Sequence, residues 1–206
     1  MRRLPFLSLL EFSPMSLTLL DPPTTEPVSL SEARDRLRVT DASQDDAINH
    51  WIQTARARVE RDTGRALIAQ TWLERRDVWW GEGRLSAFGT RFRLLKPPLI
   101  ALEAVTVYGL DDAPSEIDPA AFFVDTLSDP GRLVLRPGQS WPLPGRAAAG
   151  IGIRFRCGYG DQPGDVPAPL REAILQLTVH LAETNGASAL PPGVAALIAP
   201  YRPVML

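Results

Sequence analysis

Apolar residues recur at helical spacing between about residues 43 and 64. Their spacing of i, i+3, i+4, i+7 and i+11 puts them on one face of a helix. They are Ile48, Trp51, Ile52, Ala55 and Val59. Asp45 and Asp46 stand in the expected first turn, where the helix dipole favours acids. Gly64 is placed to end the helix in a left-handed conformation, so a helix is predicted from near Ser43 to Gly64.

Two further helices are predicted, one on each side of the middle of the chain. Ser29 and Glu32 have the spacing of a capping box, so a short helix should run to about Val39. The other helix should span about residues 170–184, with Gly186 closing it. Its buried face is expected to consist of Leu170, Ala173, Ile174, Leu177, Thr178 and Leu181.

The middle of the chain has the pattern of short strands. Several β-branched or aromatic runs are separated by Asp, Pro and Gly turns. These runs are Val105–Tyr108, Phe122–Val124 and Leu133–Leu135, and residues 151–157 alternate as a half-buried strand does. Ala66–Trp80 and Arg84–Leu95 flank Gly81-Glu82-Gly83, which predicts a hairpin between them.

Together these segments predict an α+β fold. Three main helices should form the core, and an antiparallel β block should be inserted between the second and the third. We expect one domain at 29–186, with helices at 29–64 and 167–185 and the β insertion at about 66–160. Residues 1–28 should form an N-terminal extension and arm, with Met15 as the native start. Residues 187–206 should form an extended C-terminal tail with a helical turn at 194–198.

Composition excludes several functional classes. With 45% hydrophobic residues in a chain of 206, the protein can bury a core and is not disordered. The net charge of −2 gives no overall basic field for nucleic acid. Cys157 is the only cysteine, so no intramolecular disulfide is possible, which fits synthesis in a reducing cytoplasm. No apolar run approaches the roughly 20 residues of a membrane span.

Residues that carry chemistry do not combine into a reaction centre. His50, His180 and Cys157 lie in separate predicted elements and lack the spacing of a metal site or a catalytic pair. Gly158-Tyr159-Gly160 resembles part of a glycine-rich loop but completes no phosphate-binding motif. The acidic loop, defined as Asp111, Asp112, Glu116 and Asp118, does not match a calcium-binding loop. We expect no catalytic residues, no cofactor and no metal.

Arginine makes up nearly all of the basic residues, because Lys96 is the only lysine among 22. A cluster of arginines falls in the first two predicted helices, at positions 34, 36, 38, 56, 58, 61 and 65. They could line a passage for DNA. Acidic residues are interspersed in the same helices, which favours salt bridges within and between subunits. Arg56 and Arg61 are candidates for contacts between subunits.

The order of these features closely resembles the phage head–tail connector family, including the adaptors of gene transfer agents of alphaproteobacteria. The resemblance is carried by Leu30-Ser31-Glu32-Ala33, Asp45-Asp46, the helix end at 55–65, Lys96-Pro97-Pro98, Gly158-Tyr159-Gly160 and Val166-Pro167. It covers about residues 25–185.

The resemblance implies a non-enzymatic structural subunit, made in the bacterial cytoplasm and located in the neck of a virion or gene transfer agent particle. About twelve copies would form a ring that joins the portal to the stopper on the tail side. Double-stranded DNA would pass through the ring without sequence-specific contacts, and no membrane is involved. A stopper or tail terminator, a small phosphate-binding hydrolase and a DNA-binding module remain as alternatives.

Two segments are candidates for contacts with other chains. Trp79 and Trp80 are adjacent in a predicted strand, so they point to opposite faces and one should meet a neighbouring subunit. The family's adaptor C-termini reach the portal, and by that resemblance the tail should dock in a groove between portal subunits. Its portal-binding residues would be Tyr201, Arg202, Val204, Met205 and Leu206.

Overall fold

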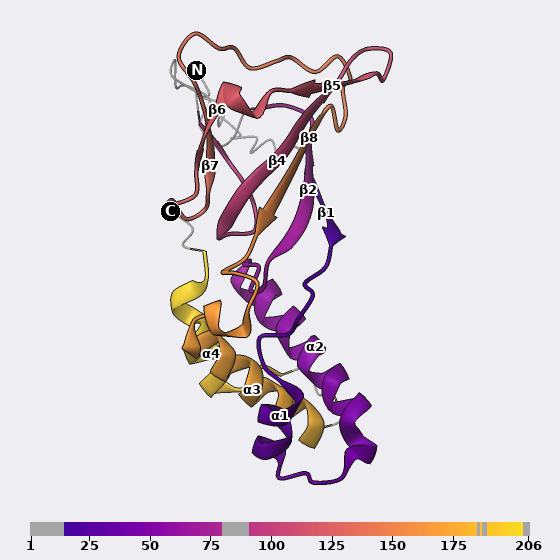
Figure 1. Ribbon diagram of the computed structural model, residues 1–206, viewed down its shortest axis with the longest axis vertical. Coiled ribbons are helices and arrows are strands. Elements are labelled where there is room, and N and C mark those ends of the chain that lie inside the picture. The colour runs from indigo at the N-terminus through magenta and orange to yellow at the C-terminus, as the bar shows by residue number, and fades with distance from the viewer. Residues whose placement is uncertain (1–14, 80–90, 185, 187–188, 204–206) are drawn as a thin grey trace, which may run out of the picture.

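The computed structural model describes residues 15–79, 91–184, 186 and 189–203. The molecule is elongated, with helices at one end and strands at the other (Figure 1). The helical half consists of α1 (Leu30–Leu37), α2 (Asp45–Thr63), α3 (Ala168–Glu183) and α4 (Pro192–Ile198). The β half consists of two antiparallel sheets. The predicted α+β fold, with the β block inserted between α2 and α3, is confirmed.

The helices begin and end where the local sequence predicts. The Ser29 hydroxyl accepts the Glu32 N–H (3.1 Å), and the Glu32 carboxylate accepts the Ser29 N–H (2.8 Å). These hydrogen bonds hold the pKa of Glu32 below its usual value. Gly64 ends α2 with a φ of 69°, as a left-handed cap requires. The Gly186 N–H donates to the Leu181 carbonyl (2.9 Å) after α3.

The predicted apolar faces form the core of the helical half. Ala55 and Val59 of α2 pack with the buried face of α3 and with α4 in one cluster. The six residues predicted for the buried face of α3 are all buried. Trp51 is the one member of the α2 face that stays partly exposed, at the margin of this core.

The β half is a sandwich of a five-stranded and a three-stranded sheet. The larger sheet has the order β1 (Met15–Asp21), β2 (Gln70–Arg76), β8 (Ile151–Cys157), β4 (Leu99–Tyr108) and β5 (Pro114–Ile117). The smaller has the order β3 (Arg91–Arg93), β7 (Arg132–Leu135) and β6 (Phe122–Asp125). Their inner faces share one apolar core, which includes Ile153 and Phe155 of β8, Phe92 of β3 and Leu133 of β7.

The predicted hairpin around Gly81–Gly83 is wrong for the strands that the structure describes. β2 pairs with β1 and β8, whereas β3 pairs with β7 in the other sheet. The two segments meet instead through side chains. The buried Glu74 carboxylate accepts the Leu95 N–H (3.0 Å), and its partner Arg76 donates to the Arg93 carbonyl (3.3 Å). Residues 81–83 themselves lie outside the described residues.

Two elements fall outside the predicted domain limits of 29–186 but pack with the rest. β1 is an edge strand of the five-stranded sheet, although residues 15–28 were expected to be only an extended arm. α4 buries Val194 and Ile198 against the helical core, although it was assigned to the tail. The folded body therefore begins before α1 and continues beyond α3.

Glu60 joins the two halves of the molecule. Its side chain lies in the last part of α2 and the residue is only 8% exposed. One carboxylate oxygen accepts the Leu67 N–H (2.9 Å) and the Gln70 side-chain amide (2.8 Å), both at the start of the β half. The other accepts from Arg56 (2.9 Å), which also pairs with Glu26 (2.7 Å). One carboxylate thus fixes the direction in which β2 leaves α2.

We predict that Glu60→Ala lowers the free energy of unfolding by about 3 kcal/mol, because it leaves a buried guanidinium and two N–H donors without their acceptor. Glu60→Gln should cost less, because it keeps one oxygen acceptor. Denaturant unfolding followed by tryptophan fluorescence measures both. Asp46→Ala, on the exposed side of the same helix, is the matched control and should change stability little. Equal losses for Ala at positions 46 and 60 would contradict the role of Glu60.

Candidate interaction surfaces

The residues proposed for a hydrolase do not share a site. Asp111 follows the end of β4 that pairs with Ile151, whereas Gly158 follows the opposite end of β8. Because β8 has seven residues, these groups are separated by about 20 Å along the strand. The N–H groups of Gly158 and Tyr159 are already used, since they donate to the carbonyls of Pro98 and Leu67 (both 2.9 Å). Nothing here presents free donors to a phosphate.

Gly158 is required by the close approach of two backbones. A Cβ at this position would lie 2.7 Å from backbone atoms of Ile68 and Ala69, and φ is 135°. The Ala69 N–H also donates to the Gly160 carbonyl (2.8 Å). The Gly-Tyr-Gly segment is therefore a structural contact between the end of β8 and the chain that enters β2.

The histidines and the cysteine lie apart from one another. His50 is exposed and contacts the Trp51 ring, with 5.5 Å between ring centroids. Nε2 of His180 is buried and has no hydrogen-bond partner among the described atoms. Burial raises the pKa of the Cys157 thiol to about 12, so it is not a nucleophile at neutral pH. In the part of the chain that the structure describes, no three His, Cys, Asp or Glu side chains gather as a metal site would require.

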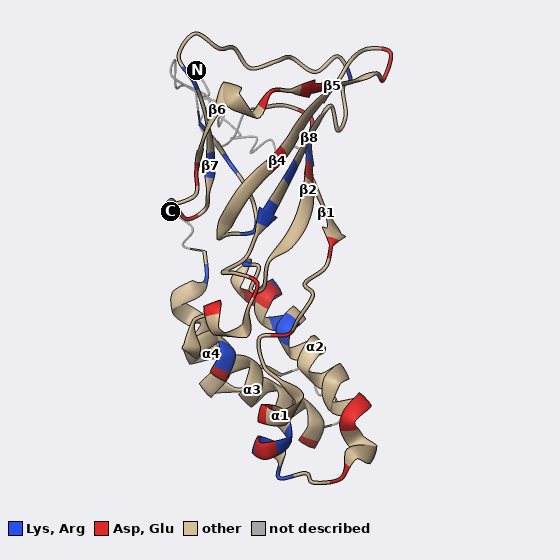
Figure 2. Ribbon diagram, in the orientation of Figure 1, with Lys and Arg blue, Asp and Glu red and all other residues tan. Residues whose placement is uncertain are grey.

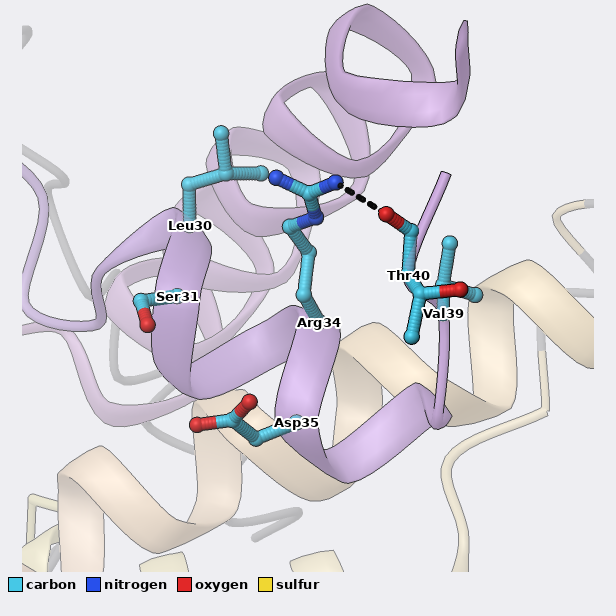
Figure 3. A pocket seen from close by; sticks show the side chains of 6 residues that line it. All are labelled: Leu30, Ser31, Arg34, Asp35, Val39 and Thr40. Atoms are coloured by element: carbon cyan, nitrogen blue, oxygen red, sulfur yellow. Dashed lines mark hydrogen bonds between the residues drawn. The ribbon is translucent and has the colours of Figure 1, made fainter. Parts of the chain in front are cut away.

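Most arginines of α1 and α2 are held by carboxylates of the same chain. The pairs are Arg34–Asp45, Arg36–Glu172, Arg56–Glu26, Arg56–Glu60 and Arg58–Asp62. A surface hollow beside α1 shows one case, in which Arg34 also donates to the Thr40 carbonyl (3.1 Å; Figure 3). The predicted salt bridges within the chain are therefore present. Arg56 is committed to them, whereas the Arg61 side chain is 68% exposed.

The two adjacent tryptophans divide as the strand geometry predicts, to the extent that the structure describes them. Trp79 is 4% exposed, donates to the Pro142 carbonyl (2.6 Å) and packs against Trp141 and Phe92 in the β core. Trp79 therefore faces its own chain and offers little surface to a neighbour. Trp80 lies outside the described residues, and its place between subunits stays a prediction.

The beginning of the C-terminal tail is attached to the protein's own body. Arg65, just beyond α2, donates to the Tyr201 carbonyl (2.8 Å) and pairs with Asp129 in the β6–β7 loop. Its guanidinium lies 6.0 Å from the centre of the Tyr201 ring. Tyr201 is partly buried against the helical core, whereas Arg202 is exposed. Residues 204–206 lie outside the described residues, so for them the portal-binding prediction is untested.

Sequence reasoning missed a basic surface on the three-stranded sheet. Arg91 and Arg93 of β3 and Arg136 after β7 are exposed, as is Phe123 of β6. Single arginines in short strands carry no periodic signal, and only the pairing of β3 with β7 and β6 brings them together.

Comparison with known proteins agrees with these features. Residues 27–83 match a family described as phage gp6-like head-tail connector protein. No curated protein matches the chain. A chain in the neck of an empty gene transfer agent (GTA) particle, computed with C6 symmetry, has a TM-score of 0.78 and 21% identity. That match covers 93% of this chain and 97% of the other.

Two other solved structures match over a similar extent. A chain in the virion of a native GTA particle has a TM-score of 0.73 and 22% identity, covering 92% of this chain and 96% of that one. A chain in the neck of a native GTA particle, computed with C12 symmetry, has a TM-score of 0.73 and 23% identity, covering 93% and 97%. The fold is that of a GTA neck protein. The resemblance expected from the sequence is confirmed in the connector match and in the fold.

The described helices give no membrane-spanning segment. Between residues 15 and 203, leaving aside the positions that are not described, none is both long and apolar enough to cross a bilayer. GTA neck proteins with this fold are parts of particles by the description of those structures.

We predict that Arg65→Ala releases the start of the tail and lowers the free energy of unfolding by about 2 kcal/mol, because charge-assisted hydrogen bonds are lost. Amide hydrogen exchange at Arg202 should accelerate, since its N–H donates to Ala199 within the attached turn. Asp129→Asn is the matched control: it removes the ion pair of a half-exposed carboxylate and should cost much less. Unchanged exchange at Arg202 in Arg65→Ala would contradict this attachment.

Proposed function

We propose that this protein is a structural subunit of the particle neck, and more specifically a head–tail adaptor that joins the portal to the stopper. The observation that carries the proposal is the similarity of almost the whole chain to chains of GTA necks, with 93% of this chain and 97% of the other covered. The connector match over residues 27–83 supports it independently. The particle would be a gene transfer agent or a related tailed phage.

The shape of the molecule suits a part that contacts two different partners. The helical and the β half lie at opposite ends and present different surfaces (Figure 1). A ring of about twelve copies would use heterologous contacts, in which one side of each copy meets a different side of the next. The C12 symmetry of one matching neck is consistent with that number. Double-stranded DNA would then pass through the ring without being read.

Two alternatives remain. Another neck component, such as the stopper or the tail terminator, would fit the same evidence at the level of the particle. A phosphate-binding hydrolase is less well supported, because in the described residues Asp111 and Gly158 lie at opposite ends of β8 and the N–H groups of Gly158 and Tyr159 are occupied. These contacts favour a structural, non-enzymatic role.

Cryo-electron microscopy of particles made by the source organism tests the function. The expected result is density for this chain directly below the portal, in about twelve copies. Particles from cells that lack the gene should have filled or empty heads without attached tails. Density below another neck protein with no portal contact would favour a stopper. Intact, tailed particles without the chain would refute the proposal.

The tail is proposed to dock in a groove between portal subunits. Because Tyr201 is held by Arg65, the part available to a partner begins at Arg202 and includes Val204, Met205 and Leu206. Contacts between subunits are proposed for Trp80 and Arg61, whose side chains the protein's own core is not known to use.

We predict that deleting residues 202–206 reduces co-purification with the portal by at least about tenfold, as loss of an apolar anchor should. Unfolding free energy should not change, because Tyr201 remains in place. Deleting residues 200–206 should lower portal binding equally and also reduce stability. Undiminished portal binding by the shorter deletion would refute a role for the tail.

A further inference from the structure

The outer face of the three-stranded sheet carries arginines that no carboxylate of the described chain neutralises. Side chains alternate along a strand, and Phe92, Leu133 and Phe122 point into the core. Arg91 and Arg93 therefore point outward from β3, and Phe123 from β6. Arg91 is opposite Val134, and Val134 is opposite Phe123, so these three form a row across the sheet.

Arg136 extends this outward set beyond β7, and its N–H donates to the Ala121 carbonyl (3.0 Å) as a continuation of the ladder. We call Arg91, Arg93, Arg136 and Phe123 the arginine face. Phe123 is 55% exposed, which is unusual for a phenylalanine in a regular strand.

The carboxylate on the same surface is already occupied. Asp125 accepts two hydrogen bonds from the Arg132 guanidinium (3.0 and 2.6 Å) and one from the Ser128 hydroxyl (2.7 Å). These bonds hold the pKa of Asp125 well below its usual value. Asp125 therefore neutralises Arg132, and the three arginines of the arginine face keep their charge.

The acidic loop lies on the other side of the same half. All four of its carboxylates are exposed, on the β4–β5 turn, on β5 and just after β5. Asp112 has a distant partner in Arg146 (3.4 Å), and Asp118 caps the turn at Ala120 (2.8 Å). Figure 2 shows the red of β5 and its preceding turn on one side of the β half and the blue of β7 on the other.

We infer that the arginine face of one copy binds the acidic loop of the next copy in the ring. This inference rests on the proposed ring and names the surfaces that close it. Both surfaces lie in the β half, at a similar level along the long axis (Figure 2). A head-to-tail contact between copies side by side requires that arrangement. Charge complementarity then fixes the order of the two faces and disfavours contacts between like faces.

A second copy fits the arginine face better than nucleic acid does. Phe123 and Val134 form an apolar row beside the arginines, and aromatic residues and arginine are the residues most enriched in protein interfaces. A phosphate backbone would gain nothing from the apolar row. The opposite charge needed for a second copy is present in the same chain, whose net charge of −2 gives no general attraction for DNA.

Cysteine cross-linking of the full chain tests the contact. Thr126→Cys lies beside the arginine face and Ala113→Cys lies in the acidic loop, and both positions are exposed. A chain with both substitutions should form a ladder of disulfide-linked dimers, trimers and larger species under mild oxidation. Cys157 is buried and should not contribute. The matched control pairs Thr126→Cys with Ser31→Cys in the helical half and should give no ladder.

Charge reversal makes the test specific. R91E/R93E/R136E and, separately, D111R/E116R should each reduce the ladder by about tenfold, because like charges would then face each other. An equal mixture of the two variants should restore it, since each reversed face then meets an opposite charge on the other variant. Restoration also shows that both variants are folded. No ladder in the unreversed chain, or a ladder that survives reversal, would overturn the inference.

DNA is the competing occupant, and its outcome is distinct. If a short DNA duplex binds the unreversed chain, is lost by R91E/R93E/R136E, and the ladder is absent, the face is for nucleic acid and the inference fails. The neck function is judged separately, by the position of the chain in particles. Failure of the cross-linking would leave a neck subunit whose ring closes through other surfaces.

Discussion

The carboxylate of Glu60 is the contact on which the arrangement of the molecule depends. A chain that crosses from a helix to a sheet leaves N–H donors unpaired at both ends, and these groups are costly when buried. Glu60 satisfies the Leu67 N–H and the Gln70 amide while Arg56 balances its charge. Arg65 makes a second link, from the end of α2 to the β6–β7 loop and the start of the tail. A subunit that touches partners at both ends needs such rigid links, because a flexible joint would spend binding energy on ordering the halves.

The helical half was predictable because its signals are local. The α2 face, the Ser29 cap and Gly64 each depend on residues within a few positions of one another, and all were found in place. The sandwich was predictable only as a set of strands. Which strands pair depends on contacts between distant segments, so β2 and β3 were joined in a hairpin although they belong to different sheets. β1 and β5 were missed for a related reason: Met15–Asp21 and Pro114–Ile117 are edge strands, where polar residues and proline are tolerated and the alternating pattern is weak.

Gly158-Tyr159-Gly160 shows how one pattern can have two physical origins. Glycines occur in phosphate-binding loops because a ligand approaches the backbone closely. Here another backbone approaches, at Ile68 and Ala69, and it uses the N–H groups that a phosphate would need. Spacing within the sequence cannot distinguish these origins, because the difference lies in what fills the space opposite the glycine. The same limit applies to Trp79, whose indole is satisfied by Pro142 and Trp141 within the chain.

Arginine composition illustrates the same problem for interfaces. Every arginine contributes equally to the net charge, but only an arginine without a carboxylate partner offers that charge to another molecule. The cluster in α1 and α2 drew attention in the sequence because it is dense, yet Arg34, Arg36, Arg56 and Arg58 are paired within the chain. Arg91, Arg93 and Arg136 are scattered in the sequence and meet only when β3 and β7 pair. Density of charge along a chain therefore predicts internal salt bridges when acids are interspersed, whereas the charge left for a partner is determined by the tertiary structure.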